Sequence, residues 1–363
     1  IYDISKVGTY GKLYVKSSDG SYVYVPNANA INALTSNTTD IFTVSVSDGS
    51  LSDTKTFTVD ITGVNDAPVI TSSEIATSID ENSGAGQVVY TVTSTDVDAS
   101  ATVSYSLSGA DADLFTIDST TGAVTLTANP NFENKSSYSF DVIATDNGTL
   151  TDTQAVTLAI NDVNDAPVIT SDATATAINE NSGAGQVVYT VTSTDEDAGA
   201  TVSYSLSGAD ADLFTIDSTT GAVTLTANPN FENKSSYSFD VIATDNGTLT
   251  DTQAVTLSIN DVNEAPVITS SATVAIDENI GAGQVVYTVT STDVDASATV
   301  TYSLSGTDAS LFTIDSTSGE VTLIANPNFE NKSSYSFNVI ATDNGTLTDT
   351  QAVTLSINDV NEA

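Results

Sequence analysis

The sequence predicts an all-β protein made of tandem Greek-key β-sandwich domains in a linear array. Three observations predict this class: a ten-residue phrase that recurs along the chain, apolar and polar residues that alternate with the period of two found in strands, and clusters of Gly, Asn and Asp between the alternating stretches. The phrase reads NDVNDAPVIT at residues 161–170. Its proline recurs at Pro68, Pro167 and Pro266, which is every 99 residues (167 − 68 and 266 − 167).

This spacing divides the chain into an incomplete first domain and three repeats. A length of 363 residues suits three or four domains of ordinary size. The expected domains are residues 1–66, 67–165, 166–264 and 265–363. The chain opens in what reads as the middle of a domain, and we interpret it as a segment of a longer polypeptide.

Each repeat should consist of short strands and should end in a hairpin. Apolar and polar residues alternate over residues 138–144 and again over 156–160, and Asn147-Gly148 between them predicts a tight turn. Shorter apolar runs raise the total to roughly seven strands, which is typical of a Greek-key sandwich. These runs lie at residues 88–92, 103–107, 114–117 and 124–126. Their aromatic residues and valines are expected to form the core.

The chain is strongly acidic. It has 47 Asp and Glu residues against 7 Lys and Arg residues, a formal charge of −40. Such a charge repels nucleic acid and anionic lipid, so neither is expected as a partner. Hydrophobic residues still make up 39% of the chain, and with the strand pattern they favour folded domains over disorder. The carboxylates therefore need a counter-ion.

Missing residue types exclude other kinds of site. Cys, His, Met and Trp are absent, which excludes disulfides, thiolate and imidazole metal sites, and Ser-His-Asp or Cys-His catalysis. Paired carboxylates of the glycosidase kind normally line an aromatic-walled cleft, and a chain without Trp is poorly suited to that. We expect no enzyme. No apolar run approaches 18 residues, so this segment is not expected to insert into a membrane.

The same carboxylates recur in every repeat, at predicted strand ends and in loops. They occur in the stretches IDEN, TDVD, NFEN, ATDNG and NDVND of the first repeat. Calcium takes six to eight oxygen ligands, which must converge from several loops when no single loop supplies them. A lone NDVNDAP could form only a linker turn. Recurrence of the whole set favours Ca²⁺ binding, with ligands from the end of one domain and the start of the next.

This order of motifs resembles tandem cadherin-type repeats of the kind found in large bacterial surface proteins. The resemblance covers residues 67–363 and implies cadherin- and immunoglobulin-like sandwiches with a Ca²⁺ cluster between successive domains. Glu81 corresponds to the early acidic residue of the family, Glu133 corresponds to the Glu of its D-R-E-like motif, and residues 162–167 correspond to its linker. Asp195 and Asp197 stand for the D-x-D of the next domain, and Asp245 for its later Asp.

Carried over residue by residue, the resemblance implies four sets of calcium ligands. They are Asp66, Asp96, Asp98 and Asp146 at the first junction; Glu81, Glu133, Asp162, Asn164, Asp165, Asp195, Asp197 and Asp245 at the middle junction; Glu180, Glu232, Asp261, Asn263, Glu264, Asp293, Asp295 and Asp343 at the last junction; and Glu278, Glu330, Asp359 and Glu362 at the end of the third repeat. The sequence departs from the family at Asn131, where Asp is usual, at Ala166, where Asn is usual, and at Glu264, where Asp is usual.

Residues 1–66 resemble a different unit, the VCBS repeat of bacterial adhesins and other long secreted proteins. The resemblance rests on GTYGKLYVKSSDGSYVYVPNANAINAL followed by DIFTVSVSDGSLSDTKTFTVDITGVNDAP, and it implies a β-sandwich that lacks its first strand or strands. This segment has no clear counterpart of Glu81 or Glu133, so the first junction has fewer evident ligands on that side.

Two classes of function remain open. Residues 102–158 recur without change at 201–257, and copying of this kind favours a rod or a multivalent binder, whose effect grows with copy number. The first class is a calcium-stiffened extender of a large bacterial (RTX-type) adhesin or surface filament, extracellular and on the cell surface or secreted. The second is a module that binds polysaccharide or a like chain. A binder should expose an aromatic platform, whereas Tyr90, Tyr105 and Tyr138 fall in strand patterns that predict burial.

Overall fold

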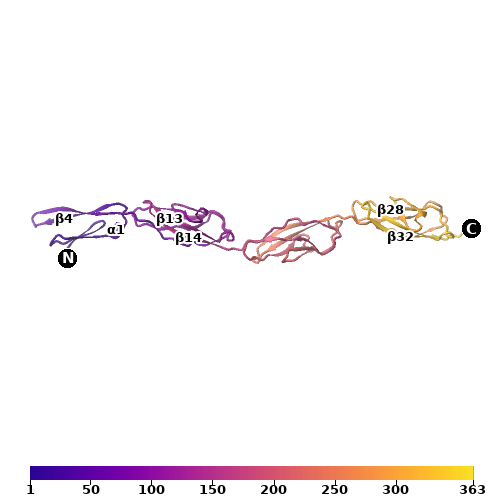
Figure 1. The fold of residues 1–363 in the computed structure, drawn as a ribbon, viewed down its shortest axis with the longest axis horizontal. Coiled ribbons are helices and arrows are strands. Elements are labelled where there is room, and N and C mark those ends of the chain that lie inside the picture. The colour runs from indigo at the N-terminus through magenta and orange to yellow at the C-terminus, as the bar shows by residue number, and fades with distance from the viewer. Residues whose placement is uncertain (363) are drawn as a thin grey trace. The chain divides into compact units, whose positions relative to one another are not determined.

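The computed structural model describes residues 1–362, and nearly all of its regular structure is β-strand, as the sequence predicts. The chain forms two compact units, residues 1–165 and residues 166 onward. Figure 1 shows the strands of each repeat grouped in a body of its own. Among the described residues, no helix is long and apolar enough to cross a bilayer.

The first domain contains five strands and one short helix. Strands β1, β2 and β3 form an antiparallel sheet in that order, and β4 and β5 form a hairpin of ten paired residues on each strand. The elements are β1 (Ile4–Val7), β2 (Gly11–Val15), β3 (Tyr22–Pro26), α1 (Ala28–Asn32), β4 (Thr38–Ser47) and β5 (Ser52–Ile61).

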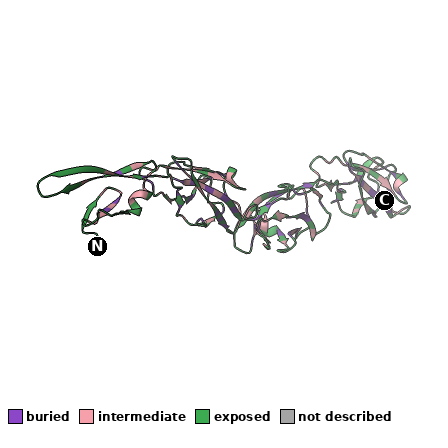
Figure 2. Ribbon diagram, turned by 60° about the vertical axis from the view of Figure 1, so that its left-hand side comes forward, coloured by how far each residue is buried: buried purple, intermediate pink, exposed green. Residues whose placement is uncertain are grey.

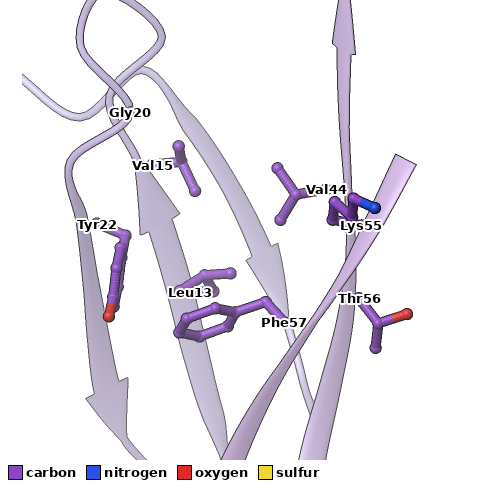
Figure 3. Close-up of a pocket in the computed structure, with 8 residues that line it drawn as sticks. All are labelled: Leu13, Val15, Gly20, Tyr22, Val44, Lys55, Thr56 and Phe57. Atoms are coloured by element: carbon purple, nitrogen blue, oxygen red, sulfur yellow. The ribbon is translucent and has the colours of Figure 1, made fainter. Parts of the chain in front are cut away.

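The first domain has a small core that is open at one side. Leu13 and Phe42 are buried between the sheet and the hairpin, but beyond them the hairpin is exposed along much of its length (Figure 2). A cavity of about 230 Å³ lies where Leu13 and Val15 on β2 face Val44 and Phe57 on the hairpin (Figure 3).

Repeat 1 is a sandwich of two sheets. One sheet has the order β10-β13-β14-β7 and the other β11-β12-β8, while β6 pairs with β9. The elements are β6 (Val69–Ile70), β7 (Ile79–Asp80), β8 (Val88–Thr91), β9 (Ser94–Thr95), β10 (Val103–Ser108), η1 (Ala112–Leu114), β11 (Phe115–Ile117), β12 (Ala123–Leu126), β13 (Ser137–Asp146) and β14 (Thr151–Asn161). The predicted hairpin around Asn147-Gly148 is confirmed as β13 and β14.

Repeats 2 and 3 have the same plan, with sheets β16-β23-β22-β19 and β17-β21-β20 in one and β25-β32-β31-β28 and β26-β30-β29 in the other. The elements of repeat 2 are β15 (Val168–Ile169), β16 (Ile178–Asn179), β17 (Gln186–Thr190), β18 (Ser193–Thr194), β19 (Ser203–Ser207), η2 (Ala211–Leu213), β20 (Phe214–Ile216), β21 (Ala222–Leu225), β22 (Ser236–Thr244) and β23 (Thr250–Asn260). Those of repeat 3 are β24 (Val267–Ile268), β25 (Thr273–Asp277), β26 (Gln284–Thr288), β27 (Ser291–Thr292), β28 (Thr301–Ser305), η3 (Ala309–Leu311), β29 (Phe312–Ile314), β30 (Glu320–Leu323), β31 (Ser334–Thr342) and β32 (Thr348–Asn358).

The core of each repeat forms around one phenylalanine on the long hairpin. In repeat 1 this is Phe140, which is fully buried and lies 4.6 Å from the ring of Phe115. Tyr138 packs edge-on against Phe115, and Tyr90 packs against Phe140, so both tyrosines are buried as predicted. Tyr105 packs at the edge of the same core and is half-buried. The period-two pattern therefore places the apolar side chains inward and leaves the strand ends free to carry carboxylates.

Candidate calcium sites at the domain ends

The C-terminal end of repeat 1 gathers three carboxylates. Strand β7 runs parallel to β14 with Asp80 opposite Asn161, so Glu81 and Asp162, which follow directly, come side by side. Glu133 joins them from the loop before β13, and one oxygen of each of the three lies within 4.8 Å of the others. Parallel pairing therefore brings together residues that are far apart in sequence.

The backbone holds Glu81 in place. Its side chain is 2% exposed and accepts hydrogen bonds from the N–H of Phe132 at 2.7 Å and of Val163 at 2.8 Å. Burial by itself would raise the pKa of Glu81, but these two donors outweigh it and the pKa is lowered. Burial and the charges of Glu81 and Asp162 raise the pKa of Glu133. Three carboxylates that repel one another in this way favour a cation between them.

Repeats 2 and 3 build the same group with one change. Their groups are Glu180, Glu232 and Glu264, and Glu278, Glu330 and Glu362. In each, the linker Glu that replaces Asp165 reaches into the group, whereas in repeat 1 the third member is Asp162. Asp359, predicted as a ligand, lies outside the group at the end of repeat 3.

An asparagine that the sequence analysis did not single out connects this group to the linker. Asn82 has a left-handed backbone (φ 54°), which Asn tolerates better than most residues, and its side-chain amide donates to Asp165 at 2.8 Å. Asn181 donates to Glu264 at 2.5 Å in the same way. The signal was present, because both asparagines follow the predicted ligands Glu81 and Glu180 directly.

The N-terminal end of repeat 1 carries a second set of carboxylates. Asp98 and Asp146 are 6% and 5% exposed, and both contact the linker that enters from the first domain. The N–H of Asp66 donates to Asp98 at 2.7 Å, and the side-chain amide of Asn65 donates to Asp146 at 2.6 Å. A β-carbon on Gly148 would lie 2.4 Å from Oδ1 of Asn65, so the turn glycine makes room for the linker. Neither Asn65 nor Gly148 was predicted as part of the site.

The last junction repeats these contacts and adds carboxylates from the preceding domain. Asn263 donates to Asp343 at 2.7 Å, and the N–H of Glu264 donates to Asp295 at 2.9 Å. Asp295 also lies within 4.8 Å of Glu232 and Asp261 of repeat 2. Burial and the charges of Asp295 and Glu180 raise the pKa of Asp261. Carboxylates from two domains therefore meet at this junction.

The corresponding residues within repeat 2 have the same local arrangement. Asp195 accepts a hydrogen bond from the N–H of Asp197 at 3.1 Å, and Asp245, 6% exposed, accepts one from the N–H of Leu249 at 2.8 Å. In the linker after repeat 1, the side-chain amide of Asn164 donates to the carbonyl of Asp165 at 3.0 Å.

The donor chemistry at these ends fits calcium. Among the described residues, the buried carboxylate oxygens that accept no hydrogen bond include Oδ2 of Asp96, Oδ1 of Asp98, Oδ2 of Asp195, Oδ2 of Asp293 and Oε2 of Glu264. A buried carboxylate oxygen without a donor is costly, and a hard cation that prefers oxygen ligands removes that cost. The first junction is different in geometry, because its carboxylates do not form a group of three within 4.8 Å among the described residues.

Comparison with known proteins identifies the family. The cadherin domain matches three stretches of the chain, residues 75–161, 174–260 and 272–358. The chain belongs to the cadherin family. Cadherin domains typically bind Ca²⁺, and the three matched domains end next to the carboxylates described above. Residues 1–66 lie outside the matched ranges.

Relatives of these cadherin domains are long proteins of which the chain covers a small part. Human protocadherin Fat 1 is 30% identical over 338 residues, which is 89% of the chain and 7% of that protein. Mouse cadherin EGF LAG seven-pass G-type receptor 3 is 30% identical over 320 residues, which is 84% of the chain and 10% of that protein.

Solved structures agree on the fold. Mouse cadherin-23 EC22-24 is 26% identical with a TM-score of 0.58, and the match covers 82% of the chain and all of that structure. Extracellular cadherin domains 1-5 of protocadherin gamma B2 are 24% identical with a TM-score of 0.63, and the match covers 99% of the chain and 73% of that structure. The second likeness supports the fold alone.

Proposed function

We propose that this chain is a calcium-stiffened extracellular extender segment of a large bacterial adhesin or surface filament. The observation that carries the proposal is the last junction, where Glu232 and Asp261 of one domain and Asp295 of the next lie within 4.8 Å of one another. Like charges at that distance repel, so without a cation they push the two domains apart. A bound Ca²⁺ supplies the positive charge that turns this repulsion into a link between domains.

The chain's own residues set where the ion is held and limit how the linker moves. Glu180 is fixed by the N–H groups of Phe231 and Val262, each at 2.8 Å, and so presents its carboxylate in one orientation. Asn263 and the N–H of Glu264 attach the linker to the next domain. The carboxylate group would hold the ion between these two fixed ends. Bending at the junction would then require breaking ligand contacts, which is why calcium should stiffen the segment.

The repeats suit an extender better than a binding module. A module for polysaccharide needs exposed aromatic side chains, but Tyr90, Tyr189 and Tyr287 are buried at the same position in all three repeats. Identical copies at residues 102–158 and 201–257 add length without adding a new surface. The VCBS-like residues 1–66 and this exact duplication support assignment to a secreted or surface protein of bacteria. A glycan array with the whole chain tests the alternative, because specific glycan binding would favour the module.

Small-angle X-ray scattering of the whole chain tests the proposal. We expect a single large maximum dimension in millimolar calcium, where extracellular calcium modules are filled, and a broader distribution of distances after chelation. Asp295→Asn should weaken the calcium effect, because it removes a charge that both domains share. Asp118→Asn is the matched control, since the side chain of Asp118 accepts hydrogen bonds from the N–H groups of Thr120 and Thr121 in a turn away from the junctions. Equal dimensions with calcium and with chelator would contradict the proposal.

A further inference from the structure

The first junction lacks carboxylates that the last junction has. Residues 1–66 contain no Glu, and Gly63 stands at the linker position that Asp162 and Asp261 occupy after repeats 1 and 2. The glycine cannot simply be replaced: a β-carbon at Gly63 would lie 2.4 Å from the carbonyl oxygen of Ser36 and 2.7 Å from that of Leu34. Backbone from the first domain fills the space that a carboxylate occupies elsewhere.

A direct contact takes the place of the missing carboxylates. The segment after helix α1 reaches repeat 1, where the N–H of Ala99 donates to the carbonyl of Ala33 at 2.9 Å. Ala99 follows Asp98, so this bond lies beside the carboxylates at the start of repeat 1. At the last junction the corresponding residue is Ala296, and it makes no backbone hydrogen bond across the junction within the described part of the chain.

The charge to be neutralised also differs between the two junctions. The first junction brings four carboxylates, Asp66, Asp96, Asp98 and Asp146. The last junction brings seven, Glu180, Glu232, Asp261, Glu264, Asp293, Asp295 and Asp343. Two oxygens at the first junction still require a partner, because Oδ2 of Asp96 and Oδ1 of the 6% exposed Asp98 accept no hydrogen bond. Four carboxylates with the oxygen of Asn65 can satisfy one calcium ion, which takes six to eight oxygens, but not a cluster.

We propose that the first junction binds a single calcium ion on the side of repeat 1, and that it stays closed without calcium through the contact between Ala33 and Ala99. The proposal rests on the proposed function, because it takes calcium to be the ion at the last junction. Mutual repulsion is smaller with four carboxylates than with seven, and the backbone contact opposes it. The segment would then have one joint that responds little to calcium and others that respond strongly.

Spin labels can compare the two junctions in one protein, because the chain has no cysteine of its own. One variant carries Thr39→Cys and Thr116→Cys, and the other carries Ser236→Cys and Thr313→Cys; all four residues are exposed. The two pairs occupy matching positions around their junctions. Double electron–electron resonance on each variant of the whole chain then gives the distance distribution with calcium and with chelator.

We expect chelation to broaden the distribution at the last junction by about twofold or more, and to leave the first nearly unchanged. Equal broadening at both would overturn the inference while leaving the proposed function intact. No broadening at the last junction would instead contradict the proposed function. Ala99→Pro removes the donor of the backbone contact and should make the first junction respond to calcium. The matched control Ala296→Pro should leave the response of the last junction as it was.

The number of bound ions gives an independent test. Mass spectrometry of the metal content after dialysis against calcium should show that Asp98→Asn loses one ion per chain. Asp295→Asn should lose more than one, because Asp295 lies among carboxylates of both domains. Equal losses from the two variants, or no loss from Asp98→Asn, would show that the first junction does not hold a single ion.

Discussion

The first and last junctions are built on the same linker but are closed by different means. In both, a linker Asn donates to a buried Asp of the next domain, at 2.6 Å for Asn65 and 2.7 Å for Asn263. At the last junction Asp261 adds a carboxylate, whereas at the first Gly63 is packed against backbone. The comparison teaches that the linker, Asn-Asp-Ala-Pro at the first junction and Asn-Glu-Ala-Pro at the last, sets how the chain enters the next domain. The residues around the linker determine how many ions the junction can bind.

The largest expected difference between the first domain and repeat 2 is in whether the stability cost of replacing a buried carboxylate depends on calcium. Asp40 of the first domain is 3% exposed and accepts from the N–H of Thr9, the N–H of Tyr10 and the hydroxyl of Tyr24, at 2.7 to 3.0 Å. Asp40→Asn places an amide against these donors and should cost about 3 kcal/mol with or without calcium. Glu180→Gln also sets an amide against the N–H of Phe231 or Val262, a cost that relief of repulsion offsets in part in chelator, and it should lose a further amount of about 3 kcal/mol only in calcium.

Hydrogen exchange resolved by mass spectrometry can measure both effects in the whole chain. Peptides from residues 38–61 report on the first domain, and peptides from residues 173–182 are unique to repeat 2. If the loss of stability in Asp40→Asn depended on calcium, Asp40 and Glu180 would not differ in the way predicted here.

Exchanging the linker residues tests the comparison directly. Gly63→Asp forces a side chain toward the carbonyl oxygens of Leu34 and Ser36 and should destabilise the first domain by about 1–3 kcal/mol. The reverse change, Asp261→Gly, should cost little stability in chelator but should weaken calcium binding at the last junction. Urea denaturation with and without calcium distinguishes the two. If Gly63→Asp is tolerated and gains calcium affinity, backbone packing does not limit the first junction.

Acid should act on the repeats through a partly buried ion pair, whereas the ion pair of the first domain is exposed. The N–H of Ser139 at 2.8 Å and the Lys135 ammonium at 3.1 Å lower the pKa of Asp111, whose side chain is 16% exposed. A lowered pKa contributes stability that is present above the unfolded-state pKa, near 4, and is lost as pH falls through the folded-state pKa.

We expect Asp111→Asn to remove about 1 kcal/mol at neutral pH and to flatten the acid-side loss of stability in repeat 1. The measurement is urea denaturation between neutral pH and about pH 2.5, in chelator so that calcium release does not contribute. The first domain should lose less over this range, since its own pair, Lys16 and Asp19, is exposed and screened by solvent. An unchanged pH profile in the variant would show that the pair contributes nothing.

Glu264→Asp is expected to give the smallest effect. The extra methylene carries the Glu264 carboxylate into the group with Glu180 and Glu232, whose charges add to the burial that raises the pKa of Glu264. Shortening it should strengthen calcium binding at the last junction by up to about tenfold, or 1.4 kcal/mol. In the natural chain the last junction should therefore release calcium before the middle one. Calorimetric calcium titration of the Glu264→Asp variant checks this prediction. Weaker calcium binding by the variant than by the natural chain would contradict the expected order of release.

Much of the fold and part of the site follow from local pattern. Alternation over residues 138–144 predicts an inward Phe140, and Asn147-Gly148 predicts the turn, because strand periodicity and turn geometry depend on near neighbours. The pairing of Glu81 with Asp162 could be expected only through the resemblance to cadherin repeats. The roles of Asn82 and Asn65 were missed, because a side-chain amide near a turn usually bonds to its own backbone.

The sequence by itself determined the strands, the repeats and the supply of carboxylates, since these depend on residue type and spacing along the chain. Only the tertiary structure decided which carboxylates meet. Asp66 contacts Asp98, 32 residues further along the chain, and Asn65 contacts Asp146, 81 residues further along. No periodic sequence pattern predicts contacts at such separations. It also decided that Gly63 has no room for a side chain, because that depends on where the backbone of Leu34 to Ser36 packs.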